Sequence, residues 1–288
     1  MKKLGLLGLG ALGMPVGERL IQHGFQLYTS VHSERSRERA QSLGIEIVDS
    51  PAEIAAYTDI VLILVNNYSQ CLECLTAEKG LFHSLKKGTV ILSSTLDPRQ
   101  AKELDVLCPQ EVHLLDAPVS GGVTGAQSGT LVTMVAGEEA VIAQCKEVFS
   151  AYSKKVVHVG SEIGRAQALK AVNQMLVAIH MVATSEAMSL ATGLGISPEV
   201  LLETVSDCAG NSNIFQNRIP KLIAGDFSAR ASLKTLEKDT AICIDLAKMV
   251  QVPCYLTSLC HDMFKCTPTT DPSLEDACAV IRLYQNQG

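Results

Sequence analysis

The first half of the chain alternates between short apolar runs and longer stretches with helical periodicity. The run at 59–66 is continuously apolar, which is typical of a central parallel strand buried on both faces. Strands alternating with helices predict a doubly wound parallel sheet. The expected strands are residues 4–9, 25–30, 45–48, 59–66, 89–93 and 112–115, and the expected helices are residues 16–23, 33–43, 97–107 and 138–149.

After about residue 164 the pattern becomes helical throughout. Residues 167–193 are apolar on nearly every side, which predicts a helix buried between domains or subunits. Further helices are expected at 197–205, 214–222, 232–250, 257–264 and 273–284. We therefore predict an α/β domain over residues 1–163. An all-helical domain for substrate binding and oligomerisation should follow over residues 164–288, headed by a long interdomain helix.

Composition narrows the functional class. Of the 288 residues, 47 % are hydrophobic, enough to bury a large core. Lys and Arg total 24 against 30 Asp and Glu, and this net charge of −6 argues against a nucleic-acid or anionic-membrane partner. No apolar stretch looks long enough to span a membrane and no export signal is evident. The ten cysteines are therefore expected to be reduced thiols of a cytoplasmic protein.

A glycine-rich motif, GLGALG at 8–13, follows the first strand directly and precedes a helix. This context is the one that supports a dinucleotide-binding loop of a Rossmann-type domain. The first glycine permits the turn, the second lets the backbone approach a pyrophosphate, and the third lets helix and strand pack closely. The expected cofactor contacts in this loop are Gly8, Gly10, Ala11, Leu12 and Gly13.

The end of the second strand bears on which nicotinamide cofactor is bound. An NAD site usually places an acid there for the ribose hydroxyls, yet positions 30–32 carry none. Ser33, Arg35 and Arg37 could instead hold a 2′-phosphate, which favours NADP. Both arginines could also be solvated helix surface, and Glu34 keeps NAD possible.

Two further groups of residues are candidates for substrate binding and catalysis. Ser120, Gly121 and Gly122 can present backbone N–H groups to an anion, although a plain glycine-rich loop would look the same. Lys170 begins a group with Asn173 and Gln174 that shares one helix face. A lysine on an otherwise apolar helix is a candidate proton donor, or alternatively a snorkelling side chain at the helix start.

Together these segments resemble the β-hydroxyacid dehydrogenase family over essentially the whole chain. The resemblance rests on the glycine loop, on DAPVSGGVTGAQSGTL at 116–131, on GRAQALKAVNQ at 164–174 and on Lys238-Asp239. Residues 211–220 and 225–227 look most like the L-threonate dehydrogenase branch. Leu12 and Asn66 depart from the Met and Pro often found at those positions.

The resemblance implies roles residue by residue. Lys170 would protonate the carbonyl oxygen, Asn173 with Gln174 would orient the substrate, and Lys238 would close the site near the nicotinamide. Ser120, Gly121 and Gly122 would hold the substrate carboxylate. Val65, Asn66 and Thr95 would line the cofactor cleft, with His32, Ser33 and Arg35 near the adenosine ribose.

The sequence thus predicts an oxidoreductase that moves a hydride between NAD(P) and a small 3-hydroxy acid or its oxo partner. Alternatives are a reductase of glyoxylate or succinic semialdehyde, an imine reductase, and a non-catalytic reader module. Lys170, Asn173 and Lys238 together argue against a reader, which needs no proton donor. The resemblance also implies a homodimer or homotetramer. No metal site is expected, and we interpret the C-x-x-C at Cys71 and Cys74 as buried thiols.

Overall fold

A computed structural model describes residues 2–31 and 33–285 of the chain, so the expected cofactor contact His32 lies outside the described residues. The chain divides into two compact units, Met1–Lys170 and Ala171–Gly288. The boundary between the units lies after Lys170, whereas the sequence predicted it after residue 163. The first residues of the long helix bond to Asp116 of the first unit's sheet and are therefore counted with that unit.

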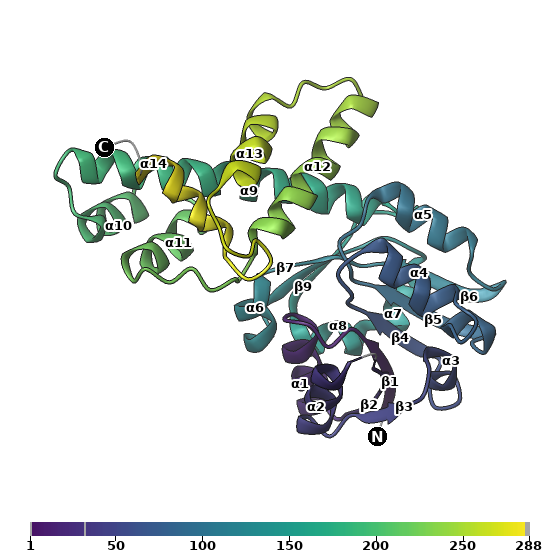
Figure 1. Ribbon diagram of the computed structural model, residues 1–288. Helices are drawn as coiled ribbons and strands as arrows, with labels where there is room; N and C mark the ends of the chain where they lie inside the picture. Colours follow the sequence, from purple (N-terminus) through teal and green to yellow (C-terminus); the bar gives the residue numbers. More distant parts are fainter. Residues whose placement is uncertain (1, 32, 286–288) are drawn as a thin grey trace. The chain divides into compact units, whose positions relative to one another are not determined.

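The first unit is built on a six-stranded parallel sheet in the order β3-β2-β1-β4-β5-β6 (Figure 1). This confirms the predicted doubly wound sheet. The strands are β1 (Lys2–Leu7), β2 (Phe25–Ser30), β3 (Glu46–Val48), β4 (Ile60–Ile63), β5 (Lys87–Leu92) and β6 (Glu111–Asp116). The helices are α1 (Gly13–Gln22), α2 (Glu34–Ser42), α3 (Pro51–Ile54), α4 (Tyr68–Thr76), α5 (Pro98–Val106) and the 3₁₀ helix η1 (Leu81–His83).

The continuous apolar runs arise because both faces of the sheet are covered. Leu6 and Leu62 belong to the hydrophobic cluster on one face, while their neighbours Leu7 and Ile63 belong to the cluster on the other. Successive strand residues point to opposite faces, so a strand covered on both sides must be apolar at every position. Each fully buried leucine of this kind stabilises the fold by roughly 1.5–3 kcal/mol.

A second, three-stranded sheet in the order β7-β8-β9 was not expected from the sequence. Its strands are β7 (Val119–Ser120), β8 (Leu131–Val135) and β9 (Ser153–His158). The helices around it are α6 (Gly122–Ser128), α7 (Glu139–Gln144) and α8 (Lys146–Tyr152). Strand β9 is mostly exposed and carries two lysines, so it lacks the apolar signature of the main strands. The helix expected at 138–149 is divided at Cys145.

The second unit is helical, as predicted, and its longest helix starts within the first unit. The helices are α9 (Arg165–Gly193), α10 (Pro198–Ser206), α11 (Asn213–Ile223), α12 (Leu233–Met249), α13 (Tyr255–Cys266), the 3₁₀ helix η2 (Ala277–Ile281) and α14 (Arg282–Gln285). Ser197, Ser212 and Ser232 cap α10, α11 and α12, each accepting from an amide three residues ahead. The last expected helix begins only at Ala277, because residues 271–276 form a turn that pairs with residues 228–233.

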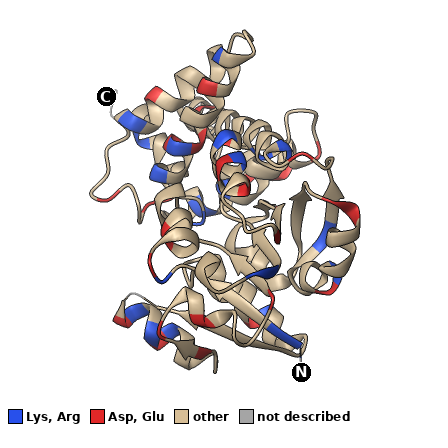
Figure 2. Cartoon of the chain, turned by 90° about the vertical axis from the view of Figure 1, so that its right-hand side faces the viewer, with Lys and Arg blue, Asp and Glu red and all other residues tan. Residues whose placement is uncertain are grey.

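Helix α9 is not covered on every side within the single chain. Its expected burial between domains or subunits therefore stays a prediction. Its large exposed apolar side chains are Leu169, Val172, Leu176 and Leu190. Together with Leu194, which directly follows the helix, they form what we call the α9 stripe, with exposures of 40–69 %. By length and composition alone α9 could span a membrane, but one such helix is equally typical of the core of a soluble protein. Charges are mixed in Figure 2, where Lys and Arg are interspersed with Asp and Glu along the elements drawn.

Candidate active site

The glycine loop has the geometry that its spacing predicts. Gly8 has φ +104°, and a Cβ there would meet the Leu64 carbonyl oxygen at 2.4 Å. A Cβ on Gly13 would meet the Gly8 carbonyl oxygen at 1.8 Å, so these two positions admit only glycine. A Cβ on Gly10 would meet nothing within 4 Å. The second glycine therefore leaves open space beside the backbone, as the approach of a pyrophosphate requires.

Helix α1 begins directly after this loop and its first turn is suited to an anion. The N-cap residue Leu12 makes no side-chain capping bond, and the first turn contains no acidic residue. Helix amides at such an end attract negative charge. The loop residues and the start of α1 therefore fit a dinucleotide phosphate.

The carboxyl ends of β1, β4 and β5 meet at the same edge of the sheet. The strand order reverses between β1 and β4, and ligands of doubly wound sheets bind at such a point. The Val65 amide donates to Ser94 Oγ at 2.9 Å, which ties together the segments after β4 and β5. The structure therefore brings Val65 and Thr95, both half-buried, to the edge that also carries the glycine loop.

The neighbouring residue Asn66 is exposed, and its amide donates to Gln70 Oε1 of α4 at 2.9 Å. This bond uses the backbone amide of Asn66, which a proline would lack, and the exposed Asn66 side chain takes no part in it.

The start of α2 carries the residues expected near the adenosine ribose. Ser33 is the N-cap and accepts from the Ser36 amide at 3.2 Å, while Arg35 is exposed. Sequence reasoning missed Arg39, whose Nη1 donates to the Leu9 carbonyl oxygen at 2.7 Å. That side chain links α2 to the glycine loop. The only signal for it was its place one turn after Arg35, which did not distinguish it from helix surface.

Ser120, Gly121 and Gly122 join β7 to α6 rather than forming a free loop. Gly121 has φ +134° and Gly122 has φ +62°, both in the region that favours glycine. A Cβ on Gly121 would also meet Leu131 Cδ2 at 2.9 Å. The two glycines are thus required by the tight turn itself, whatever they bind.

Lys170 lies near the start of α9 and is 6 % exposed. Two buried residues missed by the sequence reasoning fix this part of the helix to the sheet. Asp116 Oδ2 accepts from the amides of Gly164, Ala166 and Gln167 at 2.9, 3.1 and 3.2 Å. Gln167 donates to the Ser94 carbonyl oxygen and accepts from the Leu96 amide, both at 2.9 Å.

Burial raises the pKa of Asp116 to about 6, against the opposing effect of the amides that donate to it. The signal that could have found this residue was its place at the carboxyl end of β6, the last strand of the six-stranded sheet, inside the 116–131 block. A carboxylate there reaches the amides at the start of α9.

In the second unit, Lys238 and Gln174 share one partner. Asp239 is 2 % exposed, accepts from Gln174 Nε2 at 2.6 Å and forms an ion pair with Lys238 Nζ at 3.2 Å. Asn173 Nδ2 donates to Gln174 Oε1 at 3.1 Å. Of the expected substrate residues, the structure thus joins Asn173, Gln174 and Lys238 into one network through Asp239.

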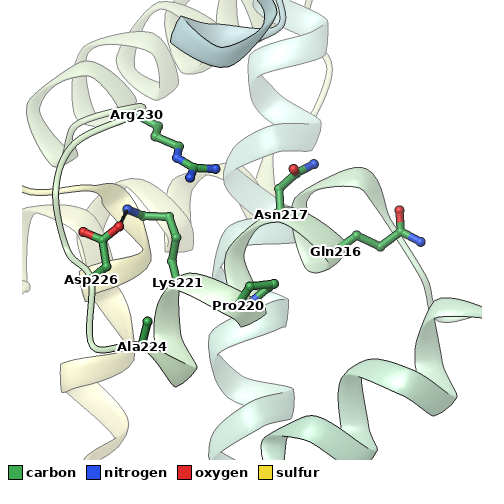
Figure 3. A pocket seen from close by; sticks show the side chains of 7 residues that line it. All are labelled: Gln216, Asn217, Pro220, Lys221, Ala224, Asp226 and Arg230. Atoms are coloured by element: carbon green, nitrogen blue, oxygen red, sulfur yellow. Dashed lines mark hydrogen bonds and ion pairs between the residues drawn. The ribbon is translucent and has the colours of Figure 1, made fainter.

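A cavity of about 300 Å³ lies beside α11 and includes none of the expected site residues (Figure 3). Its buried cation, Lys221, donates to Asp226 Oδ2, Ser228 O and Ser228 Oγ at 2.5–3.2 Å. These bonds use all three ammonium protons, and they hold the pKa of Asp226 below its usual value. The cavity therefore presents little unmatched charge beyond the exposed Arg230.

The cysteines take no part in these groups. All ten are free thiols, and burial raises the pKa of Cys74 in the C-x-x-C segment to about 12, which disfavours its thiolate. Within residues 2–31 and 33–285, no group of three or more His, Cys, Asp or Glu side chains is arranged to hold a metal ion.

Two protein families match successive parts of the chain. Residues 3–160 match the family described as the NAD binding domain of 6-phosphogluconate dehydrogenase. Residues 164–284 match the family described as NAD-binding of NADP-dependent 3-hydroxyisobutyrate dehydrogenase.

Individual relatives match over nearly the whole length. L-threonate dehydrogenase of Cupriavidus necator is 32 % identical, with 98 % of this chain and 96 % of the relative covered. Human mitochondrial 3-hydroxyisobutyrate dehydrogenase is 30 % identical, with 99 % and 87 % covered. The crystal structure of 3-hydroxyisobutyrate dehydrogenase from Salmonella typhimurium superposes with a TM-score of 0.89 at 30 % identity, covering 98 % of this chain and all of that one.

Proposed function

The chain belongs to the β-hydroxyacid dehydrogenase family and is an NAD(P)-dependent dehydrogenase of hydroxyacids, and from that premise we propose that Lys170 is its proton donor and acceptor. The substrate we propose is a small 3-hydroxy acid, of the kind named for L-threonate and 3-hydroxyisobutyrate dehydrogenases.

The observation that carries the proposal is the placement of Lys170. It is buried on the first turns of α9, and Gln167 in the same part of the helix bonds to the backbone that follows β5. The ends of β4 and β5 flank the expected position of the nicotinamide. A buried ammonium is a stronger electrostatic partner for a developing alkoxide than one in water.

The mechanism divides between cofactor and protein. The bound nicotinamide supplies the hydride chemistry. Lys170 Nζ donates a proton to the carbonyl oxygen during reduction and takes it back during oxidation. The backbone at Ser120, Gly121 and Gly122 binds the substrate carboxylate. Asn173, Gln174 and Lys238 orient the substrate, and their contacts to one another and to Asp239 support that role by limiting rotamer freedom.

NADP is the cofactor we propose, with NAD as the weaker alternative. Ser33 caps α2, so its hydroxyl lies at a helix start, and Arg35 and Arg37 are exposed on the first turns. A hydroxyl and two guanidinium groups match the chemistry of a 2′-phosphate. Replacing Arg35 and Arg37 together by Gln should raise KM for NADP at least tenfold and leave KM for NAD nearly unchanged. Equal effects on both cofactors would contradict the preference.

The test of the main proposal is nicotinamide absorbance with a panel of substrates, each with NADP(H) and NAD(H). The panel contains threonate, 3-hydroxyisobutyrate, glycerate, glyoxylate and succinic semialdehyde. Loss of a transition-state partner of this kind commonly costs about 2.7–4 kcal/mol, so Lys170→Ala should lose at least about a hundredfold in kcat. Cofactor binding, followed by NADPH fluorescence, should persist. The matched control is Lys248→Ala, an exposed lysine on α12. Near-normal turnover of Lys170→Ala would reject the assignment.

We also propose that the protein is a cytoplasmic homodimer or homotetramer. The α9 stripe supports this, since exposed leucines at helical spacing are typical of a surface that another subunit covers. Ten free thiols suit a reducing compartment. Light scattering should give a multiple of 30.8 kDa, and Leu176→Glu should reduce it. A monomeric wild-type protein would contradict the oligomer.

A further inference from the structure

Two fully buried side chains, Asp116 and Gln167, hold the start of α9 against the sheet of the first unit. Asp116 is itself fixed, because its backbone exchanges hydrogen bonds with Ala136 at 3.0 and 2.8 Å. Its carboxylate accepts from three amides around the first turn of α9. We call these two side chains and the backbone groups that they bind the α9 clasp.

Gln167 extends the clasp to the segment expected to line the nicotinamide. Its carboxamide bonds the Ser94 carbonyl oxygen and the Leu96 amide, which flank Thr95. Ser94 Oγ in turn accepts from the Val65 amide. Through the side chains of Gln167 and Ser94, the start of α9 is therefore linked to the segments after both β5 and β4.

Lys170 follows Gln167 by three residues on the same rigid helix. Residues at this spacing are neighbours on one side of a helix, about 4.5 Å apart along its axis. Any tilt or shift of the first turn therefore moves the lysine directly. Misplacing a reacting group by 1 Å can lower a rate about a hundredfold.

An alternative role for Asp116 is simply to cap the start of α9, but three other helices of the second unit are capped without a buried charge. The neutral hydroxyls of Ser197, Ser212 and Ser232 cap α10, α11 and α12. Asp116 instead brings a carboxylate into full burial, where its ionised form is disfavoured and its pKa is raised.

Among the residues that the structure describes, no ion pair joins Asp116 to a cation. The nearby Lys102 and Arg165 pair instead with the exposed Glu162. If Asp116 only capped the helix, a serine could replace it without burying a charge. The buried carboxylate therefore points to a role other than stability.

We propose that the α9 clasp is a positioning device for the active site: Asp116 and Gln167 set the place of Lys170 Nζ relative to the cofactor-lining segments after β4 and β5. This inference rests on the proposed function of Lys170. Both residues act through the lysine and neither contacts the substrate.

The experiment compares Asp116→Asn and Gln167→Met with the control Asp276→Asn, which alters a fully buried aspartate of the second unit. We expect kcat to fall at least tenfold in both clasp variants. The dissociation constant for NADPH should stay within twofold of wild type, and the Tm of Asp116→Asn should not fall. The acid limb of the kcat–pH profile, expected near pH 6, should be lost only in Asp116→Asn. Asp276→Asn should lower Tm and leave the kcat of the folded enzyme unchanged.

The double variant Lys170→Ala/Asp116→Asn separates the possible outcomes. If the clasp acts through the lysine, the double variant is no slower than Lys170→Ala. An additive loss, or clasp variants that lose Tm but keep wild-type kcat, would overturn the inference while leaving Lys170 in its role. Full activity of Lys170→Ala would instead reject the proposed function. If Asp116→Asn does not fold, Gln167→Met decides by the same readouts.

Discussion

Asp116 of the first unit and Asp276 of the second are both completely buried, and both accept hydrogen bonds from backbone amides. Asp276 caps η2 through the Cys278 amide and also binds the amides of Arg230 and Ala231 at 2.8 and 3.1 Å. It forms an ion pair with the buried Arg218 at 3.0 Å. Asp116 makes a similar set of amide contacts at the start of α9 without such a cation among the described residues.

The ion pair with Arg218 distinguishes Asp276, which stabilises the fold, from Asp116, which we propose positions the active site. A buried charge with a cation and several amides can hold a chain reversal together with little net cost. A buried charge that has amides only is less stable ionised than in water, so its presence at neutral pH opposes folding. An unfavourable group such as the Asp116 carboxylate is typical of functional sites, where the loss of stability is tolerated because the group contributes to activity.

The largest expected effect comes from removing the cation of the paired aspartate. Arg218→Ala would leave Asp276 buried with amides alone, and breaking a buried pair from one side costs about 3–5 kcal/mol. The free energy of unfolding from urea titration measures this. A loss below about 1 kcal/mol would mean that the ion pair is not what distinguishes the two aspartates.

A slightly smaller effect is expected from Gly164→Ala, which alters a donor to Asp116. Gly164 has φ +94°, and a Cβ would meet the Pro98 carbonyl oxygen at 2.7 Å. Strain of this kind costs about 1–3 kcal/mol, and kcat should fall with it because Lys170 moves. The control is Gly193→Ala at the end of α9, where a Cβ meets nothing within 4 Å, and stability should be unchanged or improved. Equal behaviour of the two variants would contradict the argument.

The pH dependence of the free energy of unfolding also tests the difference between Asp116 and Asp276. The pKa of Asp116 is raised in the folded state from 3.8 to about 6, so its protonation favours folding, and that contribution is lost as pH rises through 6. Between pH 5 and 7.5 the wild type should lose about 1 kcal/mol relative to Asp116→Asn. Urea titrations of both proteins at the two pH values measure the difference. A change of the opposite sign would show that the ionised carboxylate stabilises the fold.

The smallest effect is expected from the exposed charges near the same helix start. Lys102 and Glu162 form an ion pair with both side chains about half exposed. Exposed pairs contribute little and are screened by salt. Lys102→Gln should therefore change Tm by less than about 2 °C, and by less still in 0.5 M NaCl. A larger shift in thermal unfolding would mean that this surface pair belongs to the α9 clasp.

Much of the fold followed from the sequence because the main strands are buried on both faces and so read as apolar runs. Strand β9, with exposed lysines, gave no such run and was missed. The steric need for glycine at Gly8 and Gly13 was predicted correctly, because it depends on local spacing. The α9 clasp was not, because Asp116 and Gln167 are 51 residues apart and each looks like an ordinary polar residue. Which face of α9 is left exposed by its own chain could not be predicted, because periodicity does not distinguish a side covered within the chain from one covered by another subunit.

The contact between Arg39 and the Leu9 carbonyl oxygen has a consequence for cofactor exchange. In the proposed cofactor site, Ser33 at the N-cap of α2 and Arg35 in its first turn bind the adenosine ribose, whereas Arg39 on the same helix bonds the glycine loop. The proposal therefore implies that substitutions at Ser33 and Arg35 can change the coenzyme preference while the Arg39 bond still holds the glycine loop. Replacing the whole helix would remove both contributions.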